Sequence, residues 1–272
     1  MTHPEIGREM TLTDQIDPWR AAAMHATIDA QGPAPTVALP LFWHWIYFLE
    51  ARPARELGRD GHPAKGGFIP DLGLPRRMWA GGRLTFHAPL QIGAPASKRT
   101  VIEAITEKTG RSGPLAFVTL RHEISGREGL CITEHQDIVY RKDPDPDAPT
   151  PSPPVAPTDE TASRTVVCGP TTLFRYSALT FNGHRIHYDR DYAQTTEGYA
   201  GLVVHGPLIA QMLLAEASER GEVANFTFRA ASPAFDFEDI ALCFRPKPQG
   251  ADLWARGPDG RLIMAAAVEY RV

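Results

Sequence analysis

Residues that could move protons lie close together in Thr180–Asp189, whose sequence is TFNGHRIHYD. His187, near the end of this run, carries an imidazole that takes up and releases a proton near neutral pH. Further along the chain, Val203–Leu208 (VVHGPL) places Gly206 where an apolar helix is expected to begin. A free backbone N–H at a helix N-terminus stabilises developing negative charge. A base and an anion-binding amide are two of the parts needed to catalyse a reaction on an acyl thioester.

The second proton-transfer group is left open by the sequence. Asn182 stands where a carboxylate would be most useful, and an amide cannot act as a base. His187 must then make both proton transfers or share them with another group. His184 could be that group or a structural histidine, and Asp189 is better placed as a helix N-cap before RDYA. Both leading candidates also have a purely structural interpretation. His187 could be a buried histidine bonded to the backbone, and Gly206 could be a glycine that only begins a helix.

Arginines near the motif are candidates for substrate binding. Arg175 and Arg185 flank it, and a guanidinium can bind a substrate carboxylate through two parallel hydrogen bonds. Either could instead form a surface ion pair. Arg76, Arg77 and Arg83 could contact the phosphates of coenzyme A or a pantetheine arm, or could belong to an exposed basic loop.

The elements that must position these residues repeat along the chain. The apolar pattern in each half predicts one helix followed by antiparallel strands, which together form an α+β module. In the second half, Pro207 suits the first turn of a helix, expected over 207–219, with strands near 223–231, 236–246, 251–257 and 261–271. In the first half, the helix is expected over 41–51, with strands near 83–90, 98–108, 114–124 and 130–141.

A proline-rich segment divides the chain. Asp143–Glu160 holds seven prolines, and such a run neither continues a helix nor donates to a sheet. It predicts a linker at 143–160 between a module at 1–142 and a module at 161–272. The modules share weak similarities in the same order, such as HQDIVYR and AAVEYR near their ends, which indicates an internal duplication.

The first module is expected to lack catalytic residues. When its segment ALPLFWHWIYFL is aligned on HGPLIAQMLL, Leu39 and Arg20 stand at the positions of Gly206 and His187. We therefore expect one active site per chain, with the first module supplying the facing sheet and one wall of an acyl tunnel.

Composition narrows the function classes. A net charge of −4 over 272 residues gives no general attraction to nucleic acid or anionic membrane. Three scattered cysteines favour a reducing compartment over a disulfide framework. The apolar run Val37–Leu49 is too short to span a bilayer, and the polar N-terminus lacks a signal-peptide pattern, so we expect a cytoplasmic protein. No dinucleotide, P-loop, metal-ligand or serine-nucleophile motif is apparent, and we expect no metal or bound cofactor.

The second half resembles the MaoC-type (R)-specific enoyl-thioester hydratases, whose motif is G-D-x-N-P-[ILV]-H-x-D followed by [IV]-x-H-G-[ML]. The sequence matches at His187, at the H-x-D ending and at the H-G helix start, and departs at Asn182, His184 and Arg185. These departures resemble the subfamily of type 2 hydroxyacyl-thioester dehydratases and mesaconyl- or itaconyl-CoA hydratases. LPRRMWAGGRLTFHAPLQIG and EKTGRSGPLAFVTLRHEI resemble its N-terminal module.

The resemblance implies a double hot-dog fold and reversible hydration of a 2-enoyl thioester, with His187 as base and Gly206 as oxyanion donor. The implied substrate is a short branched dicarboxylyl-CoA of the mesaconyl or itaconyl type, and the close alternative is dehydration of 3-hydroxyacyl-ACP. Thioester hydrolysis is disfavoured because Asn182 offers an amide where thioesterases use a carboxylate. The alternative outside the enzymes is a non-catalytic subunit that binds acyl-CoA or serves as a scaffold. The chain could be a monomer or a homodimer.

Overall fold

The computed structural model describes residues 3–110, 113–142 and 152–272. Its ten strands are β1 (Glu9–Gln15), β2 (Arg76–Phe86), β3 (Pro95–Gly110), β4 (Gly113–Gly126), β5 (Gly129–Arg141), β6 (Ala162–Val167), β7 (Val223–Ala230), β8 (Asp239–Lys247), β9 (Gly250–Arg256) and β10 (Leu262–Tyr270). The α-helices are α1 (Pro18–Thr27), α2 (Pro170–Leu179), α3 (Arg190–Thr195) and α4 (Gly206–Ser218). Short 3-10 turns lie at η1 (Trp43–Ile46), η2 (Ala54–Glu56) and η3 (Arg185–His187).

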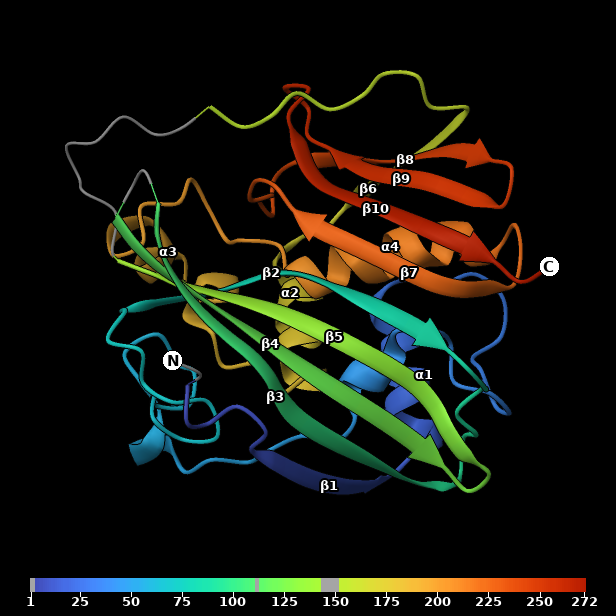
Figure 1. The fold of residues 1–272 in the computed structure, drawn as a ribbon. Helices are drawn as coiled ribbons and strands as arrows, with labels where there is room; N and C mark the ends of the chain where they lie inside the picture. The colour runs from blue at the N-terminus through green and yellow to red at the C-terminus, as the bar shows by residue number, and fades with distance from the viewer. Residues whose placement is uncertain (1–2, 111–112, 143–151) are drawn as a thin grey trace.

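All ten strands join in one antiparallel sheet, and helices α1, α2 and α4 lie on one side of it (Figure 1). The strand order is β1-β3-β4-β5-β2-β7-β10-β9-β8-β6, which reads the same from both ends when β1 is matched with β6 and β2 with β7. The two halves meet where β2 pairs with β7, from Gly81 opposite Arg229 to Thr85 opposite Asn225. This symmetry agrees with the predicted duplication and with the predicted α+β class.

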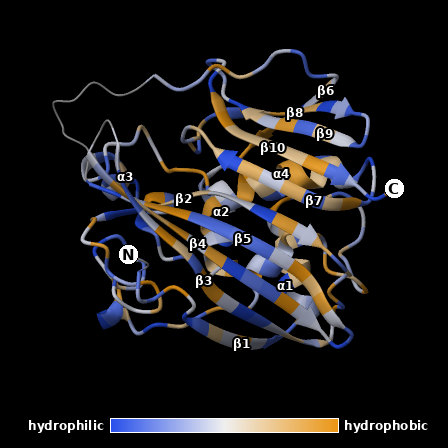
Figure 2. Cartoon of the chain, in the orientation of Figure 1, coloured by the Kyte–Doolittle hydropathy of each residue, from blue (hydrophilic) through white to orange (hydrophobic). Residues whose placement is uncertain are grey.

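Helix α4 is the central helix of the second half. Pro207 occupies its first turn, where a missing N–H costs nothing, and the following alanine, leucine and methionine residues are strong helix formers. Nearly every side chain from Leu208 to Ala217 is buried, and the helix contacts β7, β8, β9 and β10. The strands alternate hydrophobic and hydrophilic residues, so that one face of the sheet packs on this helix (Figure 2). The predictions for this helix and for β7, β8, β9 and β10 are confirmed, whereas β6 was not predicted.

The predicted helix over 41–51 is wrong. The structure has only the 3-10 turn Trp43–Ile46 there, and its α-helix in the first half is α1. Phe42 and Phe48 adopt positive φ values of 74° and 58°, which interrupt any helix. Aromatic rings explain this choice: Phe42 packs edge-on against Phe226 and Phe228 of the second half. Tertiary packing of bulky rings therefore overrides the helical apolar pattern.

Strands β3, β4 and β5 lie where they are predicted, whereas β2 spans Arg76–Phe86 instead of 83–90 and β1 was not predicted. Of the predicted linker, 143–151 lies outside the described residues. Its remainder runs along the second half, where Val155 bridges to Arg261 and Ala156 is buried beside Cys243 and Trp254. The module boundaries stay a prediction. In the part of the chain that the structure describes, no helix is both long and apolar enough to cross a membrane.

Candidate active site

The histidine motif follows α2 as a tightly bonded turn. The Asn182 side-chain Oδ1 accepts a hydrogen bond from the His184 backbone N–H at 3.0 Å, which closes the turn. The 3-10 turn η3 then carries His187, and α3 begins immediately after Asp189. The Asp189 carboxylate accepts from the Tyr192 N–H at 3.0 Å, so this residue is the helix cap that the sequence indicated.

His187 is buried with one ring nitrogen held in place. Its Nδ1 lies 2.7 Å from the Val203 carbonyl oxygen, and the Val203 N–H donates to the Ile186 oxygen at 2.9 Å. A carbonyl can only accept, so the proton must sit on Nδ1 and Nε2 keeps its lone pair. Burial, and then the nearby His184, lower the pKa of His187 to about 3. The ring is therefore neutral at working pH and presents Nε2 as a base.

Gly206 begins α4 beside this histidine. Among the described residues, no atom accepts a hydrogen bond from the Gly206 N–H. The preceding His205 stacks its ring on His187, with centroids 3.6 Å apart and planes 18° apart. Trp79 of β2 covers the other side of Gly206, where an added Cβ would lie 2.8 Å from the indole Cε3. A glycine is thus required for this contact, and it leaves an unpaired N–H at the helix start.

His205 is a buried neighbour that the sequence reasoning did not single out. Its Nε2 lies 2.9 Å from the Ser177 Oγ of α2, and its Nδ1 is buried with no partner among the described residues. Burial, and then His187, lower its pKa well below the ordinary value. The stacked pair therefore stays uncharged, and His205 adds no positive charge beside the His187 base.

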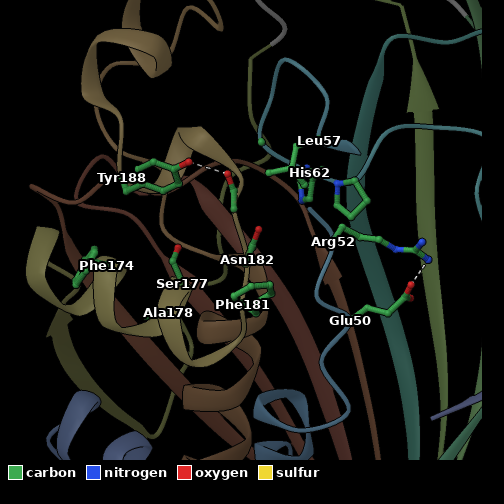
Figure 3. Close-up of a pocket in the computed structure, with 13 residues that line it drawn as sticks. Glu50, Arg52, Leu57, His62, Phe174, Ser177, Ala178, Phe181, Asn182 and Tyr188 are labelled. Atoms are coloured by element: carbon green, nitrogen blue, oxygen red, sulfur yellow. Dashed lines mark hydrogen bonds and ion pairs between the residues drawn. The ribbon is translucent and has the colours of Figure 1, made fainter. Parts of the chain in front are cut away.

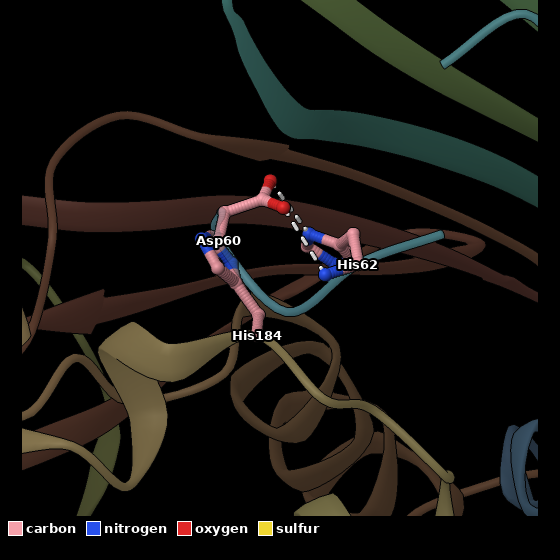
Figure 4. Close-up of side chains that lie close together, drawn as sticks. All are labelled: Asp60, His62 and His184. Atoms are coloured by element: carbon pink, nitrogen blue, oxygen red, sulfur yellow. Dashed lines mark hydrogen bonds and ion pairs between the residues drawn. The ribbon is translucent and has the colours of Figure 1, made fainter. Parts of the chain in front are cut away.

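A loop of the first half reaches the motif and brings two further groups to it. The His62 ring lies 4.3 Å, centroid to centroid, from the His184 ring, and Asp60 Oδ2 lies 3.2 Å from His62 Nδ1 (Figure 4). Burial favours the neutral form of Asp60, but its hydrogen bonds with His62 outweigh that effect and hold its pKa below the usual range. Burial, and then His62, lower the pKa of His184 to about 3. A carboxylate is thus present among the histidines, from the half expected to be catalytically empty.

Close backbone contact docks this loop on the motif. Gly61 has φ of +86°, and a Cβ added there would lie 1.9 Å from the Gly183 oxygen. The Arg185 N–H donates to the Asp60 carbonyl at 2.9 Å. The only sequence signal for this contact is the Asp-Gly-His-Pro turn itself.

A cavity of about 310 Å³ opens beside the loop and the motif (Figure 3). His62, Asn182 and Gly183 line one part of it, so the predicted Asn182 faces a space that a substrate could enter. The remaining lining comes from both halves: Glu50, Arg52, Leu57, Gly61, Pro63, Phe174, Ser177, Ala178, Phe181 and Tyr188.

The five predicted arginines do not line this cavity, and they lie in different surroundings. Arg185 pairs with Asp189 at 2.7 Å, Arg76 is buried against Glu197 at 2.6 Å, and Arg83 pairs with Asp137 at 2.8 Å. Arg175 is exposed on α2.

Arg77 is the predicted arginine whose charge acts on His184, because it is among the groups that lower the pKa of that histidine. Arg52, which lines the cavity and pairs with Glu50, was not anticipated.

Asp60, His62 and His184 also meet the spacing of a cation site. Their ligand atoms all lie within 4.8 Å of one another. The 3.2 Å contact between Asp60 and His62, however, engages both side chains with each other. The arrangement is that of a hydrogen-bonded acid–base pair, as in the histidine–aspartate part of a catalytic triad.

Comparisons with known proteins identify the family and the fold. The family model of hydroxyacyl-thioester dehydratase type 2 matches residues 42–236. Mesaconyl-C(4)-CoA hydratase of Chloroflexus aurantiacus is 51% identical over 271 residues, covering 97% of this chain and 96% of that protein. The mitochondrial hydroxyacyl-thioester dehydratase type 2 of Schizosaccharomyces pombe is 26% identical over 242 residues, covering 78% of each.

Solved structures show the same architecture. HtdX of Mycobacterium tuberculosis superposes with a TM-score of 0.69 at 18% identity, covering 97% of this chain and 100% of that one. Another Mycobacterium tuberculosis protein, with a double hot-dog fold, gives a TM-score of 0.58 at 14% identity, covering 97% and 95%. The predicted double hot-dog fold is confirmed. The chain therefore belongs to the hydroxyacyl-thioester dehydratase type 2 family and is a hydro-lyase.

Proposed function

We propose that the chain reversibly hydrates a 2-enoyl thioester to a 3-hydroxyacyl thioester, and that its substrate is a short branched dicarboxylyl-CoA such as mesaconyl-C(4)-CoA. One observation carries this proposal: a neutral His187 with a fixed tautomer lies beside the start of α4, where the Gly206 N–H has no acceptor among the described residues. Identity of 51% to a mesaconyl-C(4)-CoA hydratase supports the substrate class.

His187 acts as the base in this mechanism. Its Nε2 accepts a proton from water while the water oxygen bonds to C3 of the enoyl group. The Val203 carbonyl strengthens the base, because the positive charge that forms on the ring is stabilised through the Nδ1–H bond. In the reverse direction, the protonated ring returns the proton to the departing hydroxyl group.

Gly206 binds the anion that forms next. Addition at C3 pushes the alkene electrons onto the thioester oxygen, which becomes an enolate oxygen. The N–H at the start of α4 is unpaired among the described residues and lies at the positive end of the helix dipole. One such preorganised donor contributes about 3 kcal/mol to lowering the barrier.

Arg77 is our candidate for the free carboxylate of the substrate. In a mesaconyl-C(4) thioester the carboxylate is attached to C3, the carbon that water attacks, so its cation must lie close to the motif. Among the predicted arginines, Arg77 is the one whose charge acts on His184. Arg185 and Arg76 already neutralise carboxylates of the chain itself.

The alternative substrate is a 3-hydroxyacyl-ACP, supported by the mitochondrial relatives with the dehydratase name. The chemistry at His187 would be the same in the dehydration direction. We expect neither a metal ion nor a bound redox cofactor to take part. We also expect the chain to be cytoplasmic and to act as a monomer or homodimer.

Enoyl absorbance tests the proposal directly. The protein is incubated with mesaconyl-C(4)-CoA and with crotonyl-CoA, and loss of the enoyl band is followed. The expected result is turnover of the dicarboxylyl thioester that is abolished in His187→Ala and kept in His87→Ala, a control histidine at the surface. Failure of the wild type to turn over any enoyl thioester at high enzyme concentration would favour the non-catalytic, acyl-CoA-binding alternative.

A further inference from the structure

We propose that the Asp60–His62 pair of the first half supplies the second proton of the reaction, with His62 as the catalytic acid and Asp60 as its positioning residue. This inference rests on the proposed hydratase function. It gives the first half a chemical part in the active site, whereas the sequence predicted only a wall.

Hydration needs two proton transfers at two different atoms. Water loses a proton as its oxygen bonds to C3, and C2 gains a proton as the enolate collapses. His187 accepts the proton from water, because its Nε2 keeps a free lone pair. Among the described residues, the only hydrogen-bond partner of the His187 ring nitrogens is the Val203 carbonyl, which is uncharged. A second group is therefore needed on the C2 side, and Asn182 has no proton of suitable acidity.

His62 has the contacts of such a group. Its Nδ1 hydrogen-bonds to the Asp60 carboxylate at 3.2 Å, and this carboxylate is ionised because its pKa lies below the usual range. A carboxylate on Nδ1 stabilises an imidazolium ring and orients it, which leaves Nε2–H free to donate. His184 and His187 lack a carboxylate partner of this kind among the described residues.

The positions of the rings suit a reaction that uses two sides of one substrate. His62 lines the cavity, while His187 is buried beside the start of α4. The His184 ring neighbours both, with its centroid 4.3 Å from that of His62 (Figure 4) and 5.4 Å from that of His187. Gly206 and His187 are not among the residues that line the cavity, so the proposal requires a thioester bound at Gly206 to reach from the start of α4 to His62.

The proton balance closes without a further reactant. The water O–H bond breaks and the O–C3 bond forms, with the proton on His187 Nε2. The C2–H bond then forms with the proton of His62 Nε2, which leaves neutral His62. The protonated His187 releases its proton to solvent and His62 regains one, so that one water is consumed. Dehydration uses the same steps in reverse.

Several charged or titratable groups surround the Asp60, His62 and His184 cluster or line the same cavity, and they bear on any pH dependence. They come from the loop of His62, from the motif, from β2 and from the cavity wall: Asp60, His184, His187, Arg77, Glu50, Arg52 and Tyr188. Asp60 is the carboxylate bonded to the His62 ring itself. Its removal should therefore have the largest effect on the alkaline limb of the rate profile, where a catalytic acid loses its proton.

The test compares His62→Ala and Asp60→Asn with the matched controls His87→Ala and Asp71→Asn. Initial rates with mesaconyl-C(4)-CoA are measured across pH, with and without added imidazole and EDTA. We expect His62→Ala to lose about 10²–10⁴-fold in kcat and to regain part of it with imidazole, which the open cavity admits. Asp60→Asn should lose less and move the limb that reports the acid to lower pH.

The outcomes separate this inference from the proposed function. Hydration by the wild type with a His62→Ala rate within about twofold of His87→Ala overturns the inference alone. An Asp60→Asn profile that parallels Asp71→Asn overturns the positioning role, even if His62→Ala does not fold. Loss of wild-type activity with EDTA assigns the cluster to a metal ion instead. A wild type that hydrates no enoyl thioester overturns both proposals.

Discussion

Gly61→Ala should separate the two halves of the active site without changing any side chain that reacts. Gly61 has φ of +86°, and a Cβ added there would lie 1.9 Å from the Gly183 oxygen and 2.9 Å from its carbonyl carbon. Ordinary contacts of a Cβ begin near 3.4 Å. The loop must therefore withdraw from the motif by at least about 1 Å, because both partners in the contact are backbone.

The magnitude follows from what the withdrawal breaks. The hydrogen bond from the Arg185 N–H to the Asp60 oxygen, now 2.9 Å, lengthens or is lost. Loss of a hydrogen bond costs about 0.5–1.5 kcal/mol, and an L-residue at this φ costs about 1–2 kcal/mol more. A misplacement of about 1 Å in a reacting group can reduce the rate by about 10²-fold. We expect a comparable loss in kcat.

Gly66→Ala is the matched control. Gly66 lies in the same loop with φ of +87°, and its Cβ would meet only the Asp71 Cβ, at 3.9 Å. It shares the backbone strain of Gly61→Ala but not the collision with the motif. Both variants are assayed for enoyl absorbance loss and for urea unfolding. Equal kcat values in the two variants would refute the view that contact between the loop and the motif positions the reacting groups.

Three further predictions follow from charges and burial. Arg77→Gln should raise KM for mesaconyl-C(4)-CoA by about 10-fold or more and leave crotonyl-CoA unaffected; equal effects on both substrates would exclude a carboxylate contact. Glu134→Ala should lower the free energy of unfolding by about 3–5 kcal/mol, since this carboxylate is 3% exposed and hydrogen-bonds to His44 and Trp45. Urea unfolding measures this change, and the exposed control Glu128→Ala should alter the free energy little. Burial, followed by charged neighbours, lowers the pKa of both His184 and His187 to about 3, so the unfolded chain binds protons that the folded chain does not between about pH 6.5 and 3. Stability should thus fall with decreasing pH by up to about 1.4 kcal/mol per unit for each ring; a urea midpoint that is unchanged from about pH 7.5 to about pH 5 would contradict this.

Local sequence was sufficient where structure depends on periodicity. Helix α4 and the strands of the second half follow from an apolar helical pattern, Pro207 and the glycine and proline turns between strands. The same reasoning failed over 41–51, because the aromatic rings there pack against the second half. Contacts between halves are not encoded in the periodicity of either one.

The candidate site shows the same division. Two short segments of the sequence carry the predicted residues. The structure brings His184 and His187 to the start of α4 at Gly206, and Asn182 bonds to the His184 backbone. Asp60 escaped notice because it lies in an irregular loop far away in sequence, and only the folded chain brings it to the motif. A missing carboxylate at one position in a motif is therefore weak evidence that the whole site lacks one.

Hydration in water labelled with oxygen-18 tests the central claim most directly. The protein is incubated with mesaconyl-C(4)-CoA, and the thioester products are analysed by mass spectrometry. The account predicts an intact CoA thioester heavier by one labelled water, with the label at C3, formed by the wild type and not by His187→Ala. Free CoA with the label in a released carboxylate would identify a thioesterase instead, and an unlabelled, unchanged substrate would contradict a hydratase.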